Sequence, residues 1–264
     1  MGTRWLLNLL LFAVVVGLAA LAYLRPGLDE PLPPATISQL LPEQAQRVQI
    51  ERPGREPISL VRRENGWQLT APISLPANPF RIEPLLQLLR AQSHSSFPAV
   101  ENALSQYELL SPQVWLLIDG QRYAFGGVEP LNGYRYVMVD EAVHLLSDRV
   151  QHYLLMSPYD FVALALLPAQ SELAAVHFNR QIINDELTLA AWGEAHARRV
   201  TRYEVADGDA EPLTLTLSDG VTVQFDILLR EPEFIIGVAE RGVRYHFTEE
   251  EGEHLLAMLL ADDA

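Results

Sequence analysis

Two pairs of histidines at one spacing are the residues whose types and positions come closest to a metal site. His144 and His152 have seven residues between them, and His246 and His254 repeat this spacing beside the glutamates of residues 249–253. A metal ion needs ligands that converge at about 2.0–2.2 Å, and a spacing that runs from a predicted strand into a predicted helix does not ensure this. The sequence also has no HxxxH or HExxH pattern. We therefore interpret the histidines as equivalent, half-exposed positions, and the glutamates as a solvated helix start.

Side chains that could hydrolyse a bond are present but form no recognisable constellation. Residues 157–160 (Ser-Pro-Tyr-Asp) supply hydroxyls and a carboxylate, but the nearby chain offers only His152 as a base for a triad. Asp140-Glu141 lies between two predicted strands and is interpreted as a turn. Paired carboxylates for glycoside chemistry would need a groove that raises one pKa, which a sequence does not show.

Glycines and tryptophans are the remaining candidates for a binding site. Gly126-Gly127 lacks the helix and lysine of a phosphate-binding loop, which favours a strand end or a bulge. Trp67 and Trp192 are interpreted as equivalent anchors in the core or at its rim, with sugar stacking as the alternative. We therefore predict no catalytic, cofactor-binding or metal-binding residue, no cofactor, and a protein that is not an enzyme.

The elements that carry these residues belong to a stretch, residues 114–156, that recurs at residues 214–258. Eight identities fall at an offset of 100 residues and then of 102, as if two residues had entered a loop: Asp119/Asp219, Gly120/Gly220, Phe125/Phe225, Glu129/Glu231, Pro130/Pro232, His144/His246, His152/His254 and Met156/Met258. A duplicated unit explains this series better than chance. The opening strands recur more faintly: residues 176–178 correspond to 48–50, residues 187–189 to 58–60, and a helix at 194–203 replaces one at 79–91.

A hairpin can be derived for the second copy. Apolar and polar residues alternate on both sides of Asp219-Gly220, which is a strong hairpin signal. A three-residue loop at 218–220 opposes Leu215 to Val223 and keeps one face apolar, with Gly220 at positive φ, whereas a two-residue loop would mix the faces. In the first copy, residues 115–118 are apolar on both faces, which predicts a central strand covered on both sides.

Composition restricts the class of protein. The chain has 264 residues, of which 49% are hydrophobic and 20% are charged, as in ordered globular proteins. The net charge of −15 argues against a nucleic-acid partner, because phosphate binding needs a basic surface, and the sequence has no clustered basic patch. The absence of cysteine excludes disulfides, a thiolate nucleophile and a cysteine zinc site.

Residues 5–24 predict the location. They form an uncharged run of twenty residues between Arg4 and Arg25, long enough as a helix to cross a hydrocarbon core of about 30 Å. A cleaved signal peptide is the alternative, since residues 20–22 (Ala-Leu-Ala) resemble a cleavage site, but the run exceeds the usual signal core. We expect residues 1–25 to be an uncleaved anchor in the inner membrane, with the N-terminus in the cytoplasm and the body in the periplasm.

The predicted body follows a short, stiff tether, residues 26–35 (PGLDEPLPPA). We expect an α+β fold: two tandem, duplicated units of antiparallel sheet with covering helices, at residues 36–156 and 171–264, behind the transmembrane helix. Residues 52–55 (Arg-Pro-Gly-Arg) are a turn by composition. Residues 157–170 are too apolar for a free linker and are expected to pack as a bridge at the junction.

Several packing and turn motifs occur in the order of a known family. They are residues 58–60 (Ile-Ser-Leu), 65–72 (Asn-Gly-Trp-Gln-Leu-Thr-Ala-Pro), the helix with Leu85, Leu86 and Leu89, and then 125–127 (Phe-Gly-Gly), 136–139 (Tyr-Val-Met-Val) and 143–146 (Val-His-Leu-Leu). Together they resemble the bacterial envelope family called domain of unknown function 4340, over roughly residues 48–178. The resemblance implies a single-anchor protein of Gram-negative bacteria, often encoded beside ABC-type permeases and auxiliary proteins linked to gliding motility. It brings no catalytic residue, because none is established for the family.

Three classes of function follow from these observations. The first is a non-enzymatic, membrane-anchored extracytoplasmic module that contacts a protein partner, as an accessory of an ABC-type transporter or another envelope complex. The second is a glycan- or peptide-binding module, which would have an aromatic-lined groove between the two units. The third is an envelope hydrolase, which would need acidic or histidine side chains converging in that groove. We expect the functional surface to lie between the units, since clefts between units usually bind ligands and partners.

Overall fold

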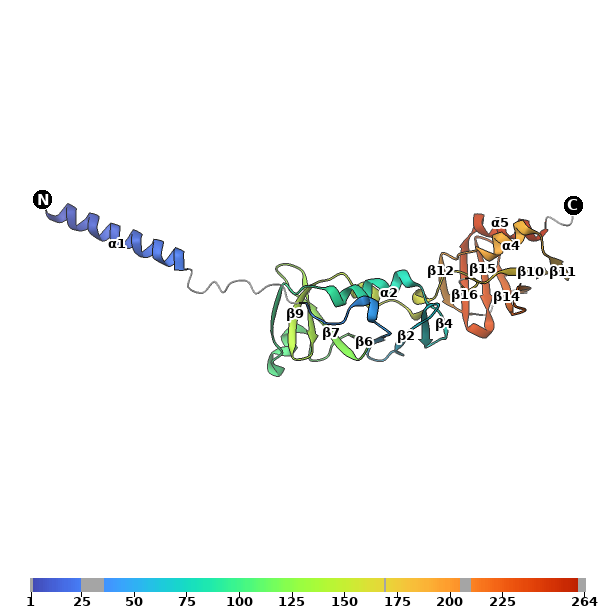
Figure 1. The fold of residues 1–264 in the computed structure, drawn as a ribbon, viewed down its shortest axis with the longest axis horizontal. Coiled ribbons are helices and arrows are strands. Elements are labelled where there is room, and N and C mark those ends of the chain that lie inside the picture. The colour runs from blue at the N-terminus through green and yellow to red at the C-terminus, as the bar shows by residue number, and fades with distance from the viewer. Residues whose placement is uncertain (1, 25–35, 169, 205–209, 261–264) are drawn as a thin grey trace.

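The computed structural model describes residues 2–24, 36–168, 170–204 and 210–260, and the predicted tether at residues 26–35 lies outside these ranges. Helix α1 (Gly2–Leu24) comes first, and two antiparallel sheets with covering helices follow (Figure 1). The predicted α+β class with antiparallel sheets is therefore confirmed. Among the described residues, no helix is found that is long and apolar enough to cross a membrane, and the anchor at residues 5–24 stays a prediction.

The first sheet has nine strands within the described ranges, in the order β4-β3-β2-β1-β6-β7-β8-β9-β5. Every neighbouring pair in this order is antiparallel. The strands are β1 (Arg47–Glu51), β2 (Ile58–Arg63), β3 (Gly66–Ala71), β4 (Leu75–Pro76), β5 (Ser95–Pro98), β6 (Val114–Ile118), β7 (Gln121–Val128), β8 (Tyr134–Val139) and β9 (Ala142–Ser147).

Short helices cover one face of this sheet, which we call its inner face. Helix α2 (Pro79–Leu86) begins where the Asn78 side chain accepts a hydrogen bond from the Phe80 backbone N–H at 3.1 Å, and Ile82 and Leu85 of this helix are fully buried. The remaining helical segments of this half are η1 (Pro42–Gln44), η2 (Gln87–Arg90), η3 (Glu101–Tyr107), α3 (Gln151–Leu154) and η4 (Pro158–Phe161). The predicted helix at 79–91 is therefore α2 continued by η2.

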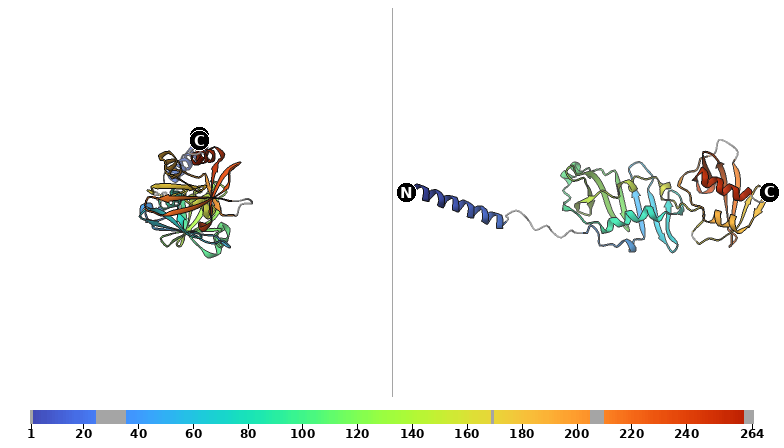
Figure 2. Two further views of the ribbon diagram at one scale, coloured as in Figure 1. Left: turned by 90° about the vertical axis from the view of Figure 1, so that its right-hand side faces the viewer. Right: turned by 90° about the horizontal axis from the view of Figure 1, so that it is seen from above.

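The second sheet has seven strands in the described part of the chain, in the order β11-β10-β13-β14-β15-β16-β12, again antiparallel throughout. They are β10 (Leu173–Phe178), β11 (Gln181–Ile183), β12 (Arg199–Arg202), β13 (Glu211–Leu217), β14 (Thr222–Leu229), β15 (Glu233–Val238) and β16 (Val243–Thr248). Helices α4 (Glu186–Gly193) and α5 (Glu249–Leu260) cover one face, and Figure 2 shows α5 lying across it. The 3-10 turn η5 (Ala239–Arg241) connects β15 to β16.

Both sheets follow the same succession of elements. The equivalent pairs are β1 and β10, β2 and β11, α2 and α4, β5 and β12, β6 and β13, β7 and β14, β8 and β15, β9 and β16, and α3 and α5. In each sheet, the strand after the first helix returns to pair with the last strand, as β5 does with β9 and β12 with β16. The first half differs by the additional strands β3 and β4 and the 3-10 helices η1, η2 and η3, and the second half by η5. The two Asp-Gly turns thus join equivalent strands, β6 to β7 and β13 to β14.

The two Asp-Gly turns nevertheless have different geometries. In the second hairpin, Leu215 opposes Val223, the Leu217 N–H donates to the Val221 carbonyl at 2.8 Å, and Gly220 has a φ of 85°, which confirms the predicted three-residue loop. In the first hairpin, Ile118 pairs directly with Gln121, which leaves a two-residue loop. Both of its loop residues, Asp119 and Gly120, have positive φ, as a tight hairpin turn requires.

The faint correspondences predicted for the second half are wrong in part. Residues 176–178 do lie in β10, the equivalent of β1, but residues 187–189 belong to α4 and not to a strand. The helix expected at 194–203 is also displaced, because α4 ends at Gly193 and β12 follows. A local cap explains the helix: the Asp185 side chain accepts a hydrogen bond from the Thr188 N–H at 2.9 Å. Trp67 therefore lies in a strand and Trp192 in a helix, and the two are not equivalent.

The segment between the two sheets is packed into both. The Asn78 N–H donates to the Phe161 carbonyl at 2.7 Å on the side of the first sheet, and the Ala197 N–H donates to the Leu164 carbonyl at 2.8 Å on the side of the second. Phe161 and Leu166 are 0% and 2% exposed and belong to one apolar cluster with residues of both sheets. The two sheets therefore share a core.

Candidate functional site

The face of the first sheet opposite α2, its outer face, is covered at one end only. There, η3 and Leu109 lie over β7, β8 and β9, and a small second cluster forms around Leu109, Ala124 and Val143. A Cβ on Gly126 would lie 2.2 Å from the Tyr107 carbonyl oxygen, so only glycine lets η3 approach this closely. The strand register also shifts between Phe125 and Val128. Gly126-Gly127 is therefore a bulge beneath η3, as the sequence predicts.

Beside this cluster, the outer face carries a group of large side chains that η3 leaves partly exposed, and one of them, Trp115, packs against the cluster. Trp115 and Leu117 of β6 are half-buried, although the sequence predicts a strand covered on both sides. The guanidinium carbon of Arg122 lies 3.8 Å from the centre of the Trp115 ring, in cation–π contact. An Arg122 nitrogen lies 3.2 Å from a Glu51 carboxylate oxygen, and the Gln49 amide donates to the other oxygen at 3.1 Å. We call Trp115, Leu117, Arg122 and Glu51 the tryptophan surface.

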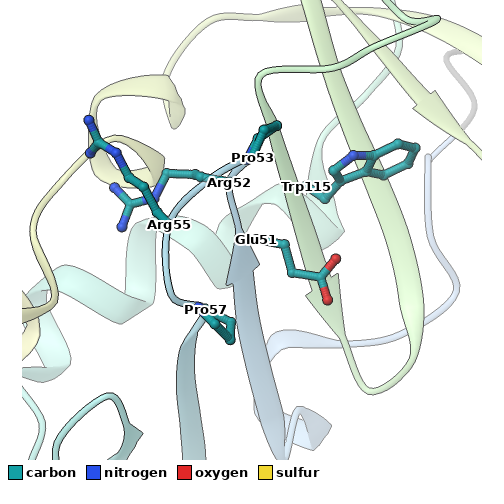
Figure 3. A pocket seen from close by; sticks show the side chains of 6 residues that line it. All are labelled: Glu51, Arg52, Pro53, Arg55, Pro57 and Trp115. Atoms are coloured by element: carbon teal, nitrogen blue, oxygen red, sulfur yellow. The ribbon is translucent and has the colours of Figure 1, made fainter.

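A pocket of about 370 Å³ opens beside the tryptophan surface. Figure 3 shows its lining, with the side chains of Arg52 and Arg55 at one end and those of Glu51 and Trp115 at the other. A tight turn follows β1 and forms the arginine end: the Arg55 N–H donates to the Arg52 carbonyl at 3.1 Å, and Gly54 has a φ of 71°. Proline at the second position of such a turn and glycine at the third are the residues that it favours, so Pro53 and Gly54 fix the two arginines close together.

Arg52 is held rigidly in this pocket. Its side chain is buried, and its Nη1 donates to the carbonyls of Leu155 and Met156 at 3.1 and 2.7 Å, at the end of α3. Its Nε is buried and has no hydrogen-bond partner. Burial lowers the pKa of Arg52, and the positive charge of Arg55 lowers it further. The pocket therefore contains a desolvated cation beside a second cation.

The four histidines of the predicted pairs do not come together. His144 and His246 lie in the equivalent strands β9 and β16 but on opposite faces: His144 pairs with Val137 of the shared core, whereas His246 lies between the core residues Tyr245 and Phe247 and faces the other side. The predicted equivalence of the two positions is therefore wrong, and His246 is buried rather than half-exposed. His152 and His254 are exposed on α3 and α5. In the described residues, no group of three or more possible metal ligands is found. The Thr248 N–H donates to the Glu251 carboxylate at 3.0 Å, and the Glu251 N–H donates to the Thr248 hydroxyl at 3.2 Å, which forms a capping box at the start of α5.

His246 joins the one arrangement that resembles a catalytic triad. Its Nε2 lies 2.8 Å from the Thr201 hydroxyl and its Nδ1 lies 3.1 Å from the Glu233 carboxylate, which also pairs with Arg199 at 2.8 Å. His246 is only 4% exposed, and the pocket described above contains none of these residues. The network links β12, β15 and β16, which makes it a structural connection between strands.

The histidines of β9 and β16 lead to opposite expectations for substitution. His246→Leu should lower the free energy of unfolding by about 2 kcal/mol, because two hydrogen bonds are lost. His144→Leu should leave stability unchanged or raise it, because the Nδ1 of His144 is buried with no partner. Urea denaturation of both variants measures the difference, and an equal loss in both would contradict the interpretation.

The same pair predicts how stability changes with pH. Burial lowers the pKa of both His144 and His246 in the folded protein. The unfolded chain, with histidine pKa values near 6.5, therefore binds these protons more readily, and stability that is present above that pH is lost as the pH falls below it. We expect the denaturation midpoint to decrease between about pH 7.5 and pH 5, and to decrease less in His246→Leu.

The other predicted candidates have local structural roles. Asp140-Glu141 forms the tight turn between β8 and β9, with Asp140 at a φ of 51°. Ser157 and Asp160 cap η4: the Tyr159 N–H donates to the Ser157 hydroxyl, and the Ser157 N–H donates to the Asp160 carboxylate at 2.8 Å. The arginine end of the pocket is absent from the sequence-based candidates. The Arg-Pro-Gly-Arg turn was a signal for it, because such a turn brings its first and last residues together.

Comparison with known proteins gives one match. No curated protein and no solved structure is significantly similar to the chain. The matching family is described as "Domain of unknown function (DUF4340)", and its model aligns with residues 67–189, a range that includes Trp115 and Arg122 but not Arg52 or Arg55. This match confirms the family expected from the sequence motifs, and the chain carries a region of the DUF4340 family at residues 67–189.

Proposed function

We propose that the chain is a non-enzymatic module that binds a protein partner through the tryptophan surface while its N-terminal helix holds it at the inner membrane. The observation that carries the binding role is a contrast between equivalent strands. The outward side chains of β6 are Trp115 and Leu117, whereas those of the equivalent β13 are Thr214 and Thr216. Threonines suit a solvated sheet face, whereas Trp115 and Leu117 leave apolar surface partly exposed there, although Trp115 also packs against the small cluster beneath η3.

The composition of the tryptophan surface is that of a binding hot spot. Tryptophan and arginine are the residues most enriched among those that dominate protein–protein affinity. Here, Arg122 lies against the Trp115 ring and is also paired with Glu51, so the indole is held in a defined orientation before a partner arrives. Side chains that are already ordered lose less conformational entropy on binding. This arrangement supports a protein partner more strongly than it supports catalysis.

The membrane role is supported by the sequence and the exposure of α1. The described side chains Leu10, Leu11 and Phe12 of this helix are 63%, 66% and 69% exposed. A helix that is apolar on all sides needs lipid or protein around it. The uncharged run at residues 5–24 and the resemblance to single-anchor envelope proteins favour lipid, with the body in the periplasm. The neighbourhood of ABC-type permeases in that family suggests the partner: a component of a transporter or another envelope complex.

We also propose that the two sheets arose by duplication. The eight identities at nearly constant offsets and the shared order of strands and helices support this. On this view, one copy acquired the tryptophan surface and the other did not.

Peptide binding is the second candidate function, and the pocket beside Trp115 favours it. The expected cleft between the units remains a prediction, since the pocket described here lies on the first sheet.

Site-specific photo-cross-linking in intact cells tests this proposal. A benzophenone amino acid replaces Leu117 in the full-length chain, and the matched control carries it at Thr216, the equivalent outward position of the second sheet. We expect a cross-linked partner from position 117, lost in a Trp115→Ala background, and none from position 216. Cross-links of equal yield from both positions, or products that persist without Trp115, would contradict the proposal. Amine-reactive cross-linkers are poorly suited here, because all 19 basic residues are arginines.

A further inference from the structure

We propose that the pocket beside the tryptophan surface binds a carboxylate of an acidic peptide segment, with the anion on Arg52 and Arg55 and an apolar side chain of the peptide against Trp115. The inference rests on the proposed function and names the chemistry of the partner. Its basis is a pair of arginines that has no anionic partner among the described residues.

Most ion pairs among the described residues of this acidic chain join an arginine to a carboxylate. The arginines paired in this way are Arg90, Arg122, Arg135, Arg198, Arg199, Arg230 and Arg244. Arg52 and Arg55 are in none of these pairs, although the whole chain has 34 acidic residues for 19 basic ones. Other described arginines, such as the adjacent Arg62 and Arg63, are also in no ion pair, but they are exposed, whereas Arg52 is buried. The charge of an incoming anion would compensate Arg52 and Arg55.

Arg52 is a fixed part of the pocket, because the residue is only 8% exposed and its side chain has no room to adopt another rotamer. Nη1 is fixed by the two carbonyls at the end of α3, and the buried Nε has no partner. Arg55 is exposed and makes no side-chain hydrogen bond to a described residue, so its guanidinium is free to close on the same anion.

The repulsion between Arg52 and Arg55 also favours the binding of an anion. Burial lowers the pKa of Arg52 and the charge of Arg55 lowers it further, so an anion placed between the two guanidinium groups would be attracted by both. The Pro53-Gly54 turn prevents the two residues from separating. A carboxylate is flat, with two acceptor oxygens, and therefore fits the forked donors of a guanidinium.

The rest of the lining selects what is attached to the anion. Pro53, Pro57 and the Trp115 ring form an apolar wall, and Glu51, paired with Arg122, bounds the end away from the arginines (Figure 3). A volume of about 370 Å³ lies at the small end of the range for ligand pockets and has room for one or two side chains. The negative charge of Glu51 gives the pocket a direction, so the anion lies at the arginine end and an uncharged or basic group lies near Glu51. A peptide with an acidic residue next to a leucine meets these requirements.

The test measures binding of defined peptides to the full-length chain in detergent micelles by fluorescence anisotropy. The probe is a fluorescein-labelled peptide ending in Leu-Asp-Leu with a C-terminal amide, and its matched control has Asn in place of Asp. We expect the neutral peptide to bind at least about tenfold more weakly, which is the effect of losing one charge-assisted hydrogen bond. Raising the salt concentration should weaken binding of the acidic peptide only.

Arg55→Gln is the informative variant, because Arg55 is exposed and its side chain holds no described element in place. It should weaken binding of the acidic peptide about tenfold and leave the neutral peptide unaffected. Arg149→Gln is the matched control: Arg149 is likewise exposed and in no described ion pair, and its substitution should change affinity by less than about twofold. Equal effects of the two substitutions, or displacement of the peptide by inorganic phosphate at equal concentration, would overturn the assignment.

The outcomes separate this inference from the proposed function. If position 117 still cross-links its partner while the acidic peptide shows no dependence on Arg55, the acidic-peptide site is wrong and the partner-binding surface stands. If the peptide depends on Arg55 but position 117 captures no partner, the pocket is real and the proposed function is wrong.

Discussion

Replacing Gly252 with alanine is expected to lower the free energy of unfolding by about 3 kcal/mol. Gly252 is a buried residue of α5, and a Cβ at this position would lie 2.1 Å from the Cβ of Phe234 and 2.5 Å from its Cγ. Phe234 is fully buried in β15 and cannot move aside, so α5 must shift away from the sheet. Overpacking of this kind usually costs about 1–3 kcal/mol, and a clash with atoms so close to the backbone belongs at the upper end.

The matched control is alanine at Gly193, which is also helical and has an ordinary φ. Its nearest neighbour to an added Cβ is the Leu173 side chain at 3.9 Å, a normal contact. Because alanine favours helix by about 1 kcal/mol over glycine, Gly193→Ala should be neutral or stabilising. Thermal denaturation followed by circular dichroism compares the two variants. A melting temperature for Gly252→Ala equal to that of Gly193→Ala would show that α5 does not pack as described.

Trp192→Ala should be the most destabilising single substitution of an aromatic residue in the second half, with a cost of about 3–5 kcal/mol. The indole is fully buried between α4 and the core, and its Nε1 donates a hydrogen bond to the Leu255 carbonyl of α5 at 3.2 Å. Removing the ring leaves a large cavity and removes the hydrogen bond between α4 and α5, and losses of this size are typical of such changes. Equilibrium unfolding in urea measures the effect.

Trp67→Ala provides the comparison, because the sequence suggests that the two tryptophans are equivalent. Trp67 is half-exposed in β3, one of the strands that the second sheet lacks, and a cost of about 1–2 kcal/mol is expected. Similar losses of unfolding free energy in Trp67→Ala and Trp192→Ala would indicate that the two tryptophans are equivalent, contrary to the structure.

Local rules predict the parts of this fold in which neighbouring residues decide the conformation. The alternation around Asp219-Gly220 fixes the register of β13 and β14, because any shift would expose one apolar row. The repeat of spacings also places His144 and His246 in the equivalent strands β9 and β16, although not on the same face. These features need no knowledge of distant contacts.

The failures arise where short patterns are ambiguous or where contacts are distant. Residues 187–189 (Leu-Thr-Leu) alternate like a strand, but the cap at Asp185 and the burial of Trp192 make them helical. The pocket depends on Arg52 reaching carbonyls that are 103 and 104 residues away, a contact that no local pattern reveals. The position of Gly252 in a run of glutamates likewise indicates a solvated helix start, whereas its close approach to Phe234 is a tertiary feature.

The apolar cluster shared through Phe161 and Leu166 has a consequence for how the two copies evolve. Two sheets that share a core unfold together, so a mutation that melts the second also removes the first. Natural selection on the tryptophan surface therefore extends to the buried residues of the second sheet, even if that sheet contacts no partner. Its outward threonines escape this constraint. Among related sequences, the interior of the second copy should consequently change slowly and its solvated face quickly, as expected for a copy retained as a scaffold.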